Sequence, residues 1–318
     1  METILVTGAA GFIGSYTCKA LLEQGYQVVG IDDLNDYYDP ALKEARLQWL
    51  RRYDQFLFHK IDFRDLVTTQ GIFQQYQFER ICHLGARAGV RASVEDPLIY
   101  EATNIRGTLN LLELARQYSI RYFVLASTSS VYGGNTKLPF AETDPVDHPV
   151  SPYAATKKAA EILAYTYHHL YQIHCIILRF FTVYGPWGRP DMALFKFTQA
   201  ILNDQPIQVY NFGKQRRDFT YIDDIVAGVV AALHSDYAYE IINLGNSNPE
   251  QLIDFITAIE QATGKTARQQ LIEAQPGDVV ETYADITKAK QLLKFQPTTN
   301  LVQGIEQFVR WYRDYYHV

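Results

Sequence analysis

Residues 3–14 read TILVTGAAGFIG, an apolar run followed by a glycine-rich turn. Thr3–Thr7 has the length and composition of a buried strand, and the helical pattern that follows it, Phe12–Gln24, ends before Gly25. Glycines between a strand and a helix allow a tight turn and let the backbone approach a pyrophosphate, which the helix N-terminus attracts. A plain strand–helix turn would show the same glycines, so the rest of the chain has to decide. The residues predicted to bind the phosphates are Gly8, Gly11, Phe12, Ile13 and Gly14.

Apolar runs continue to alternate with amphipathic stretches through the first half of the chain. Buried strands separated by helices predict a parallel, doubly wound α/β sheet of the Rossmann type, covered on both faces. The expected strands are Thr3–Thr7, Gln27–Ile31, Phe56–Ile61, Arg80–Leu84, Tyr122–Ala126 and His174–Phe180, and the expected helices include Phe12–Gln24, Pro97–Tyr118 and Pro152–Tyr171.

After Phe180 the regular alternation ends. A helix is expected around Ala193–Leu202, and another at Asp223–His234 precedes a strand, Tyr239–Leu244, that could rejoin the sheet. We therefore expect a dinucleotide-binding domain over residues 1–180, with residues 221–245 returning to it. A smaller, partly interleaved α/β domain over residues 181–220 and 246–318 would bind the substrate, and it would include the apolar face of Leu301–Tyr315.

Composition and charge narrow the possible partners. The 318 residues include 29 Lys and Arg against 35 Asp and Glu, a net charge of −6, which argues against nucleic acid as a partner. Cys18, Cys82 and Cys175 match neither a disulfide framework nor a metal site and favour a reducing cytoplasm. The longest apolar run, Ile225–Leu233, is half of a membrane span, and no leader pattern precedes the first strand. We expect a cytoplasmic protein with no metal site and no membrane partner.

Two acidic residues end the next two predicted strands. Asp32 follows Gly14 by 18 residues, close to the spacing of a carboxylate that binds the adenosine ribose of a dinucleotide. Asp32 and Asp33 together would repel a 2′-phosphate, so the pair favours NAD over NADP. Asp62 is placed to meet the adenine edge, although it could equally cap a loop.

Tyr153 and Lys157 are four residues apart on a predicted helix and therefore share one face. Tyr210 and Lys214 have the same spacing, but their segment has little helical character and we reject them. Ser151 followed by proline is a good start for the helix of the first pair. A nearby ammonium and a cationic nicotinamide ring would favour the phenolate of Tyr153 and suit it to act as a base.

A strand end rich in hydroxyl groups, Ala126–Gly133, precedes that helix. Ligands of doubly wound folds bind at the carboxyl ends of the strands, which is where Thr128, Ser129 and Ser130 would lie. A serine-rich turn with no ligand would read the same way.

Taken together, the glycine loop, the hydroxyl-rich strand end and the YxxxK helix resemble the extended short-chain dehydrogenase/reductases over essentially the whole chain. Within them the sequence is similar to the nucleotide-sugar 4-epimerases that act on UDP-glucuronate. The segments that carry this second resemblance are Asn35–Pro40, Arg87–Arg91, Ser129–Gly133, Gly188–Met192, Arg216–Asp224 and Pro276–Asp278.

The resemblance implies a role for each matching residue. Tyr153 would take the proton of the sugar 4-hydroxyl while C4 gives a hydride to a tightly bound NAD, Lys157 would bind the nicotinamide ribose, and Thr128 would lie beside the 4-oxygen. Further cofactor contacts are implied for Asp32, Asp62, Phe63, Leu84, Asn104 and Tyr153. Contacts to the UDP-sugar are implied for Arg87, Ser129, Ser130, Thr182, Arg189, Arg217 and Asp278, with Arg217 at the pyrophosphate and Asp278 on the uridine ribose side. A homodimer with a four-helix contact through Pro97–Tyr118 and Pro152–Tyr171 is also implied.

The residues after Thr128 indicate the outcome of the reaction. A 4,6-dehydratase needs an acid–base carboxylate pair there, and the decarboxylases of the family carry Glu at the position of Ser130. Return of the hydride to the opposite face of the keto sugar, an epimerisation, is what remains. We expect Ser129, Ser130, Thr182 and Arg189 to hold the uronate carboxylate where CO₂ is not lost. The alternatives are a 4-epimerase for neutral UDP-hexoses or UDP-N-acetylhexosamines, and a non-catalytic NAD-binding regulatory protein.

Overall fold

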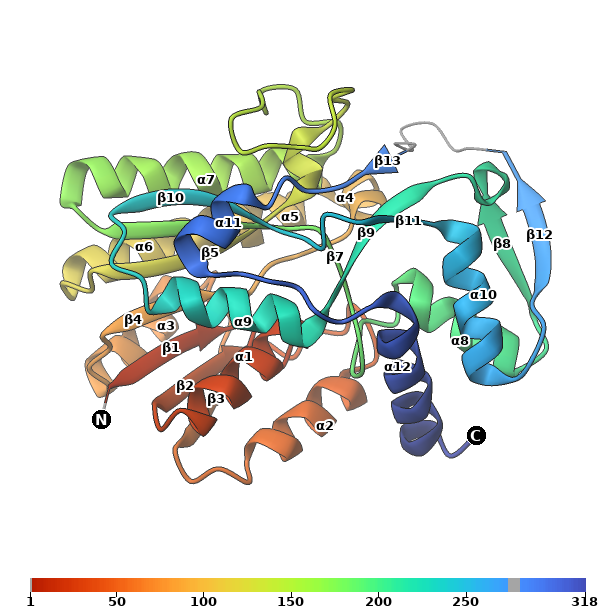
Figure 1. Cartoon of the computed structure of the whole chain (residues 1–318). Helices are drawn as coiled ribbons and strands as arrows, with labels where there is room; N and C mark the ends of the chain where they lie inside the picture. Colours follow the sequence, from red (N-terminus) through yellow and green to blue (C-terminus); the bar gives the residue numbers. More distant parts are fainter. Residues whose placement is uncertain (1, 274–280) are drawn as a thin grey trace.

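A seven-stranded sheet forms the centre of the protein, which we describe from a computed structural model over residues 2–273 and 281–318. The strand order is β10-β6-β5-β4-β1-β2-β3, and every neighbouring pair is parallel (Figure 1). This order reverses direction beside β1 and confirms the doubly wound sheet. The strands are β1 Thr3–Thr7, β2 Gln27–Asp32, β3 Phe56–Lys60, β4 Arg80–His83, β5 Tyr122–Thr128, β6 His174–Phe180 and β10 Tyr239–Leu244.

Helices cover both faces of this sheet. Successive residues of β1 alternate between two apolar cores, with Ile4 and Val6 in one and Leu5 in the other, because side chains along a strand point to opposite faces. One face is covered by α1 Phe12–Glu23, α2 Pro40–Leu50 and α9 Ile222–Leu233, and the other by α3 Leu66–Gln75, α6 Gly107–Gln117 and α7 Pro152–Tyr171. The strands are apolar on both sides because helices bury both faces of the sheet, as the sequence predicted.

The long helix expected at Pro97–Tyr118 is less regular than predicted. After α4 Val90–Glu95, the chain forms α5 Pro97–Tyr100, a π-helical segment Glu101–Arg106 and then α6. The wide π-helical turn carries Asn104, which is buried and is held by hydrogen bonds from outside the helix. Periodicity does not reveal such an interruption because a tertiary contact stabilises it.

The second half builds a smaller layer beside the carboxyl ends of the strands. As expected, β10 joins the sheet next to β6, and the helix before it, α9, begins at Ile222. The remaining elements are β7 Thr182–Tyr184, α8 Ala193–Leu202, β8 Pro206–Tyr210, β9 Arg216–Tyr221, β11 Pro249–Gln251, α10 Leu252–Thr263, β12 Arg268–Ile272, β13 Glu281–Thr282, α11 Thr287–Leu293 and α12 Leu301–Tyr316. The strand β7 begins two residues after the carboxyl end of β6 and pairs with β9. This pairing sets the smaller layer against the edge of the sheet where ligands of doubly wound folds bind.

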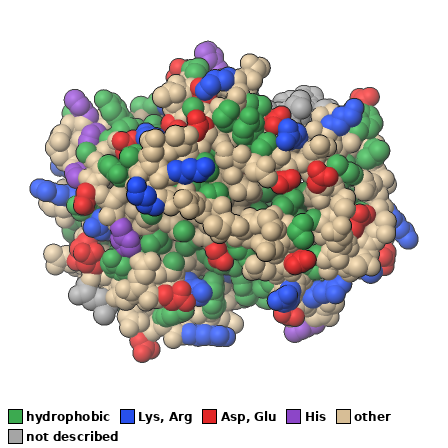
Figure 2. Space-filling view, viewed as in Figure 1, with side chains coloured by type: hydrophobic (Ala, Val, Ile, Leu, Met, Phe, Trp, Pro, Cys, Tyr) green, Lys and Arg blue, Asp and Glu red, His purple; other side chains and the backbone are tan. Residues whose placement is uncertain are grey.

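The surface mixes charges of both signs. On the face shown in Figure 2, the described Lys and Arg side chains are interspersed with Asp and Glu side chains. None of the helices within the described ranges is both long and apolar enough to cross a membrane. Residues 2–273 and 281–318 contain no group of three or more His, Cys, Asp or Glu placed to hold a metal ion.

Candidate active site

A cavity of about 390 Å³ opens at the carboxyl ends of the parallel strands. It is continuous from the glycine loop to the start of α7 and the loop after β7, so the predicted cofactor and substrate residues meet in one space. The predicted residues that line it are Gly8, Gly11, Phe12, Ile13, Gly14, Asp32, Asp62, Phe63, Leu84, Arg87, Thr128, Ser129, Ser130, Tyr153, Lys157, Thr182 and Arg189.

The glycine loop has the form that a dinucleotide phosphate requires. A Cβ on Gly14 would lie 2.0 Å from the carbonyl oxygen of Gly8, so helix and loop pack too closely for any side chain. Gly8 has a φ of +69°, a conformation that favours glycine. Gly11 precedes α1 and no side chain caps that helix, which leaves its first N–H groups to a ligand. This part of the cavity fits the phosphates of NAD.

Asp32, the residue predicted to bind the adenosine ribose, lies at the end of β2 and lines the cavity. Its carboxylate is buried, and this burial raises its pKa, while the ammonium of Lys43 at 3.6 Å acts in the opposite direction. Lys43 also lines the cavity, and the sequence analysis missed it. In the sequence, Lys43 could have been found only by its place shortly after the Asn35–Pro40 motif. Its position in a helix does not reveal that its charge is buried.

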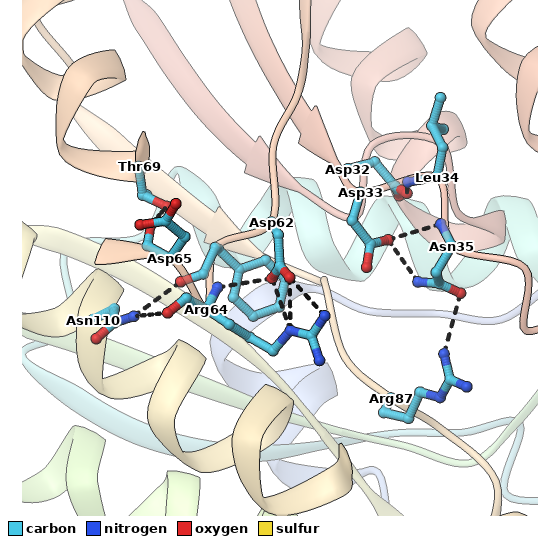
Figure 3. A network of polar contacts seen from close by, with 11 residues as sticks. Asp32, Asp33, Leu34, Asn35, Asp62, Arg64, Asp65, Thr69, Arg87 and Asn110 are labelled. Atoms are coloured by element: carbon cyan, nitrogen blue, oxygen red, sulfur yellow. Dashed lines mark hydrogen bonds and ion pairs between the residues drawn. The ribbon is translucent and has the colours of Figure 1, made fainter. Parts of the chain in front are cut away.

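Asp62 caps a loop, one of the two roles that the sequence left open, and its contact with the adenine edge stays a prediction. Its carboxylate accepts hydrogen bonds from the backbone N–H and from Nε of Arg64, so it caps its own loop (Figure 3). Burial works against its charge, but the contacts with Arg64 prevail and lower its pKa. The same residue lines the cavity beside Phe63.

Arg87 crosses from the loop after β4 to the loop after β2 (Figure 3). Its Nη1 donates to Oδ1 of Asn35 over 3.2 Å, and Nδ2 of Asn35 donates to Asp33 over 2.6 Å. Behind it, Oδ1 of Asn104 accepts from the backbone N–H of Arg87, and Nδ2 of Asn104 donates to the Arg87 carbonyl and to Thr156. Asn104 therefore fixes the loop that presents Arg87, and its contact with the cofactor stays a prediction.

Tyr153, Lys157 and Thr128 come together where α7 begins. Ser151 caps α7 by accepting from the N–H of Ala154, which sets Tyr153 in the first turn of the helix. Desolvation raises the pKa of the Tyr153 phenol, whereas its hydrogen bond with the Thr128 hydroxyl and the nearby Arg189 lower it. Burial lowers the pKa of Lys157 to about 8. The three groups can hold and move a proton at one oxygen.

A buried ion pair holds this helix against the sheet. Glu161, one turn after Lys157, accepts from Nε of Arg179 at 2.9 Å and from its Nη2 at 2.8 Å, and also from the hydroxyl of Ser127 at 2.6 Å. Arg179 belongs to β6 and Ser127 precedes Thr128 on β5. The carboxylate of Glu161 therefore ties the helix with the tyrosine to the strand end with the threonine.

Arg189 brings positive charge to the far end of the cavity. Its Nε and Nη2 both donate to the carboxylate of Asp191, with 3.0 Å for the Nε contact. Ser129, Ser130 and Thr182 line the same cavity. Guanidinium and hydroxyl donors next to Tyr153 form an arrangement that suits a carboxylate on the reacting sugar.

Comparison with known proteins places the chain in a family. A model of the family described as GDP-mannose 4,6 dehydratase matches residues 5–308. The chain belongs to the GDP-mannose 4,6 dehydratase family. This result confirms the resemblance to extended short-chain dehydrogenase/reductases.

Members named as 4-epimerases are among the most similar proteins. The UDP-glucuronate 4-epimerase of Thermodesulfobacterium geofontis is 48% identical over 99% of this chain and 97% of its own length. The UDP-glucuronic acid 4-epimerase of Bacillus cereus, solved with UDP-glucuronic acid and NAD, has a TM-score of 0.91 at 39% identity, covering 99% of this chain and 100% of that one. The UDP-glucose 4-epimerase of Thermotoga maritima, solved with UDP-glucose, has the same TM-score at 30% identity, with 99% and 100% covered.

The structure gives the positions of only part of the predicted pyrophosphate and uridine contacts. Arg217 lies on β9, and its Nη1 donates to the carbonyl oxygen of Arg216 over 2.9 Å. Asp278 lies outside the described residues. Their assignments to the pyrophosphate and the uridine ribose therefore stay predictions.

Proposed function

We propose that this protein is an NAD-dependent UDP-glucuronate 4-epimerase, which interconverts UDP-glucuronate and UDP-galacturonate. One observation carries the proposal: a single cavity joins a dinucleotide loop, the Tyr153–Thr128–Lys157 group and the guanidinium of Arg189. The names of similar proteins support it, because the epimerase from Bacillus cereus was solved with both UDP-glucuronic acid and NAD.

The cofactor would be held by the glycine loop, by Asp32 at the adenosine ribose and by Lys157 at the nicotinamide ribose. When bound, NAD supplies a reversible hydride acceptor for C4 of the sugar. Tyr153 takes the proton of the 4-hydroxyl and returns one to the 4-oxygen after the keto sugar has turned its other face. The ammonium of Lys157 and the hydroxyl of Thr128 stabilise the phenolate in between.

The side chains after β5 select epimerisation. Ser129 and Ser130 stand where elimination or loss of CO₂ would need a carboxylate, and serine hydroxyls are too weakly acidic or basic to replace it. A 4-keto-uronate is nevertheless a β-keto acid, which loses CO₂ fastest when its C–C bond aligns with the carbonyl π system. Arg189, Ser129, Ser130 and Thr182 hold the carboxylate away from that alignment.

The first experiment needs only the purified protein and UDP-glucuronate, without added cofactor. We expect UDP-galacturonate to appear by NMR, with no UDP-pentose, and one NAD or NADH per chain to be released on denaturation. Turnover of neutral UDP-hexoses or UDP-N-acetylhexosamines with inert uronate would assign the protein to the neutral-sugar epimerases. Absence of both bound cofactor and any turnover would favour a regulatory protein.

A second experiment tests the carboxylate-binding role of Arg189. In Arg189→Ala we expect kcat/KM for UDP-glucuronate to fall by about 10- to 100-fold, as for a lost charged hydrogen bond, and UDP-pentose to appear as a by-product. Intact uronate turnover with no pentose would reject this role. Lys196→Ala changes a cation of α8 that does not line the cavity and serves as the control.

We also propose a homodimer formed by the helices on one face of the sheet. Leu98 of α5, Leu109 of α6 and Ile162 and Tyr165 of α7 are exposed apolar side chains on neighbouring helices. Burying them against a second copy would form the predicted four-helix contact. Light scattering at working concentration should give twice the chain mass, and a monomer mass would exclude the contact.

The domain division and the compartment are proposed on separate grounds. Residues 1–180 with 221–245 would bind NAD, and residues 181–220 with 246–318 would bind the nucleotide sugar. Cys18, Cys82 and Cys175 are buried free thiols, which favours a reducing cytoplasm. Fractionation of the native host's cells would test the proposed cytoplasmic location.

A further inference from the structure

Tyr37 lies at the sugar end of the cavity, in the loop between β2 and α2. Two cations face its ring: the guanidinium carbon of Arg87 is 4.5 Å from the ring centroid and that of Arg189 is 5.8 Å away. These arginines come from different loops, after β4 and after β7. A single aromatic ring thus contacts two of the predicted substrate-binding residues.

The hydroxyl end of Tyr37 is held in a slot that glycine creates. Gly89 has a φ of +120°, and a Cβ there would lie 2.5 Å from the Tyr37 hydroxyl oxygen, so any side chain would displace the ring. The Tyr37 hydroxyl lies beside that of Tyr100, which in turn donates to the carbonyl of Ala88 over 3.1 Å. The ring is therefore fixed at one end and presents its body to the two guanidinium groups.

The two guanidinium groups retain unused donors. Asp191 occupies the Nε and Nη2 edge of Arg189, so Nη1 is not part of that pair. Nε of Arg87 is buried and has no hydrogen-bond partner among the described residues. The partner that Arg87 does have, Asn35, is neutral. Asp191 pairs with Arg189, and the carboxylate of Asp33 reaches Arg87 through Asn35, so neither pairing uses Nη1 of Arg189 or Nε of Arg87.

We propose that Tyr37 is a positioning residue for recognition of the substrate carboxylate. Its ring holds Arg189 and Arg87 close together through cation–π contacts, against their mutual repulsion, so that the uronate meets an already formed cationic site. This inference rests on the proposed function and deepens it, because it names a residue that makes the site selective for UDP-uronates over UDP-sugars without a carboxylate. Tyr37 is argued to act through Arg189 and Arg87, not on the reacting atoms.

The test compares two substitutions of Tyr37. Tyr37→Leu removes the ring, and we expect KM for UDP-glucuronate to rise by about tenfold, the size of one or two cation–π contacts, with kcat changed by less than about threefold. Tyr37→Phe keeps the ring and should keep KM within about twofold of the unmodified protein. The inhibition constant of UDP-xylose, which lacks the carboxylate, should not change in either variant.

A matched control lies at the opposite end of the sheet. Tyr122, the first residue of β5, has the guanidinium carbon of Arg80 4.0 Å from its ring centroid, the same kind of contact away from the cavity. Tyr122→Leu should leave KM for UDP-glucuronate unchanged. If Tyr37→Leu does not retain NAD, Tyr37→Met takes its place with the same expected result.

Coupling to Arg189 separates positioning from a general structural effect. In an Arg189→Ala background, Tyr37→Leu should raise KM by clearly less than in the unmodified background. Full additivity, an unchanged KM in Tyr37→Leu, or an equal loss of UDP-xylose affinity would overturn the proposal. The proposed function fails separately, namely if the unmodified protein converts neutral UDP-sugars and leaves UDP-glucuronate unchanged.

Discussion

The two halves of the cavity are built in different ways. The half proposed to bind the cofactor is built on a tightly packed backbone turn, the glycine loop between β1 and α1, with Asp32 beside it at the end of β2. The sugar half is formed by side chains from separate loops, with Arg87, Arg189 and Tyr37 holding one another. The glycine loop has no room for an added Cβ at Gly14. The protein can lose one side chain of the cluster at the sugar end and still fold. Each half should therefore respond differently to substitution.

Loss of the Tyr153 hydroxyl should give the largest effect, because Tyr153 is the base of the proposed reaction and lines the cavity together with Thr128 and Lys157. In Tyr153→Phe we expect kcat to fall by about 10²- to 10⁴-fold, the usual contribution of a general base, with NAD still bound. Steady-state kinetics and the NAD content of the purified variant measure the two quantities. Loss of NAD along with kcat would mean that the tyrosine also supports the cofactor half.

Removing the charge of Glu161 should weaken the contacts that hold α7 against β5 and β6. Glu161→Gln leaves the buried guanidinium of Arg179 without a counter-charge, so we expect the free energy of unfolding to fall by about 3–5 kcal/mol. The negative charge of Glu161 raises the pKa of Lys157, which burial lowers to about 8. Without that charge, Lys157 loses its proton at a lower pH.

Denaturant titration and the pH dependence of kcat/KM check this prediction. The alkaline decline of kcat/KM, with a midpoint near pH 8 in the unmodified protein, should move to lower pH in Glu161→Gln. A decline that stays in place or moves to higher pH would show that the ammonium of Lys157 is not what activity requires.

An added methyl group should disable the cofactor half and spare the sugar half. In Gly14→Ala the new Cβ would lie 2.0 Å from the Gly8 carbonyl oxygen, so the loop must shift. We expect a loss of about 1–3 kcal/mol in stability, as for other overpacked sites, and little retained NAD. Gly71→Ala on α3, where a Cβ meets nothing within 4 Å, is the matched control and should stabilise by about 0.5–1 kcal/mol. Retention of stoichiometric NAD in Gly14→Ala would contradict the idea that the close packing of the glycine loop is needed to bind NAD.

The smallest effect is expected outside both halves. Glu113 of α6 pairs with Arg116 on the same helix, and both side chains are partly exposed. Glu113→Gln should change the free energy of unfolding by about 0.2–1 kcal/mol and leave kcat and KM unchanged. A change as large as that of Glu161→Gln would show that burial does not govern the strength of these ion pairs.

Regular patterns made the cofactor half and most of the fold predictable. Apolar runs placed β1 and β6 with their observed bounds, and the spacing from Gly14 to Asp32 singled out a residue that ends β2 and lines the cavity. The capping residue Ser151 and the proline after it placed Tyr153 in the first turn of α7. In each case the signal is local, because strand alternation, helix caps and glycine turns act over a few residues.

Other features could not be read from local patterns. The π-helical segment that breaks the helix Pro97–Tyr118 depends on contacts of Asn104 with Arg87 and Thr156. Lys43 is a helical lysine that sequence reasoning would leave in solvent, yet it is buried beside Asp32. Both depend on partners far away in the sequence.

By itself, the sequence determined the doubly wound sheet, the dinucleotide loop and the tyrosine–lysine pair, because strand periodicity and helix spacing fix which residues share a face or an edge. Only the tertiary structure decided that the ring of Tyr37 contacts both Arg87 and Arg189, and that Glu161 joins α7 to β5 and β6. Loops from distant parts of the chain meet there, and their meeting depends on side-chain contacts that no short-range pattern encodes. The net charge of −6 likewise describes the whole chain, while the cationic end of the cavity depends on where two arginines lie.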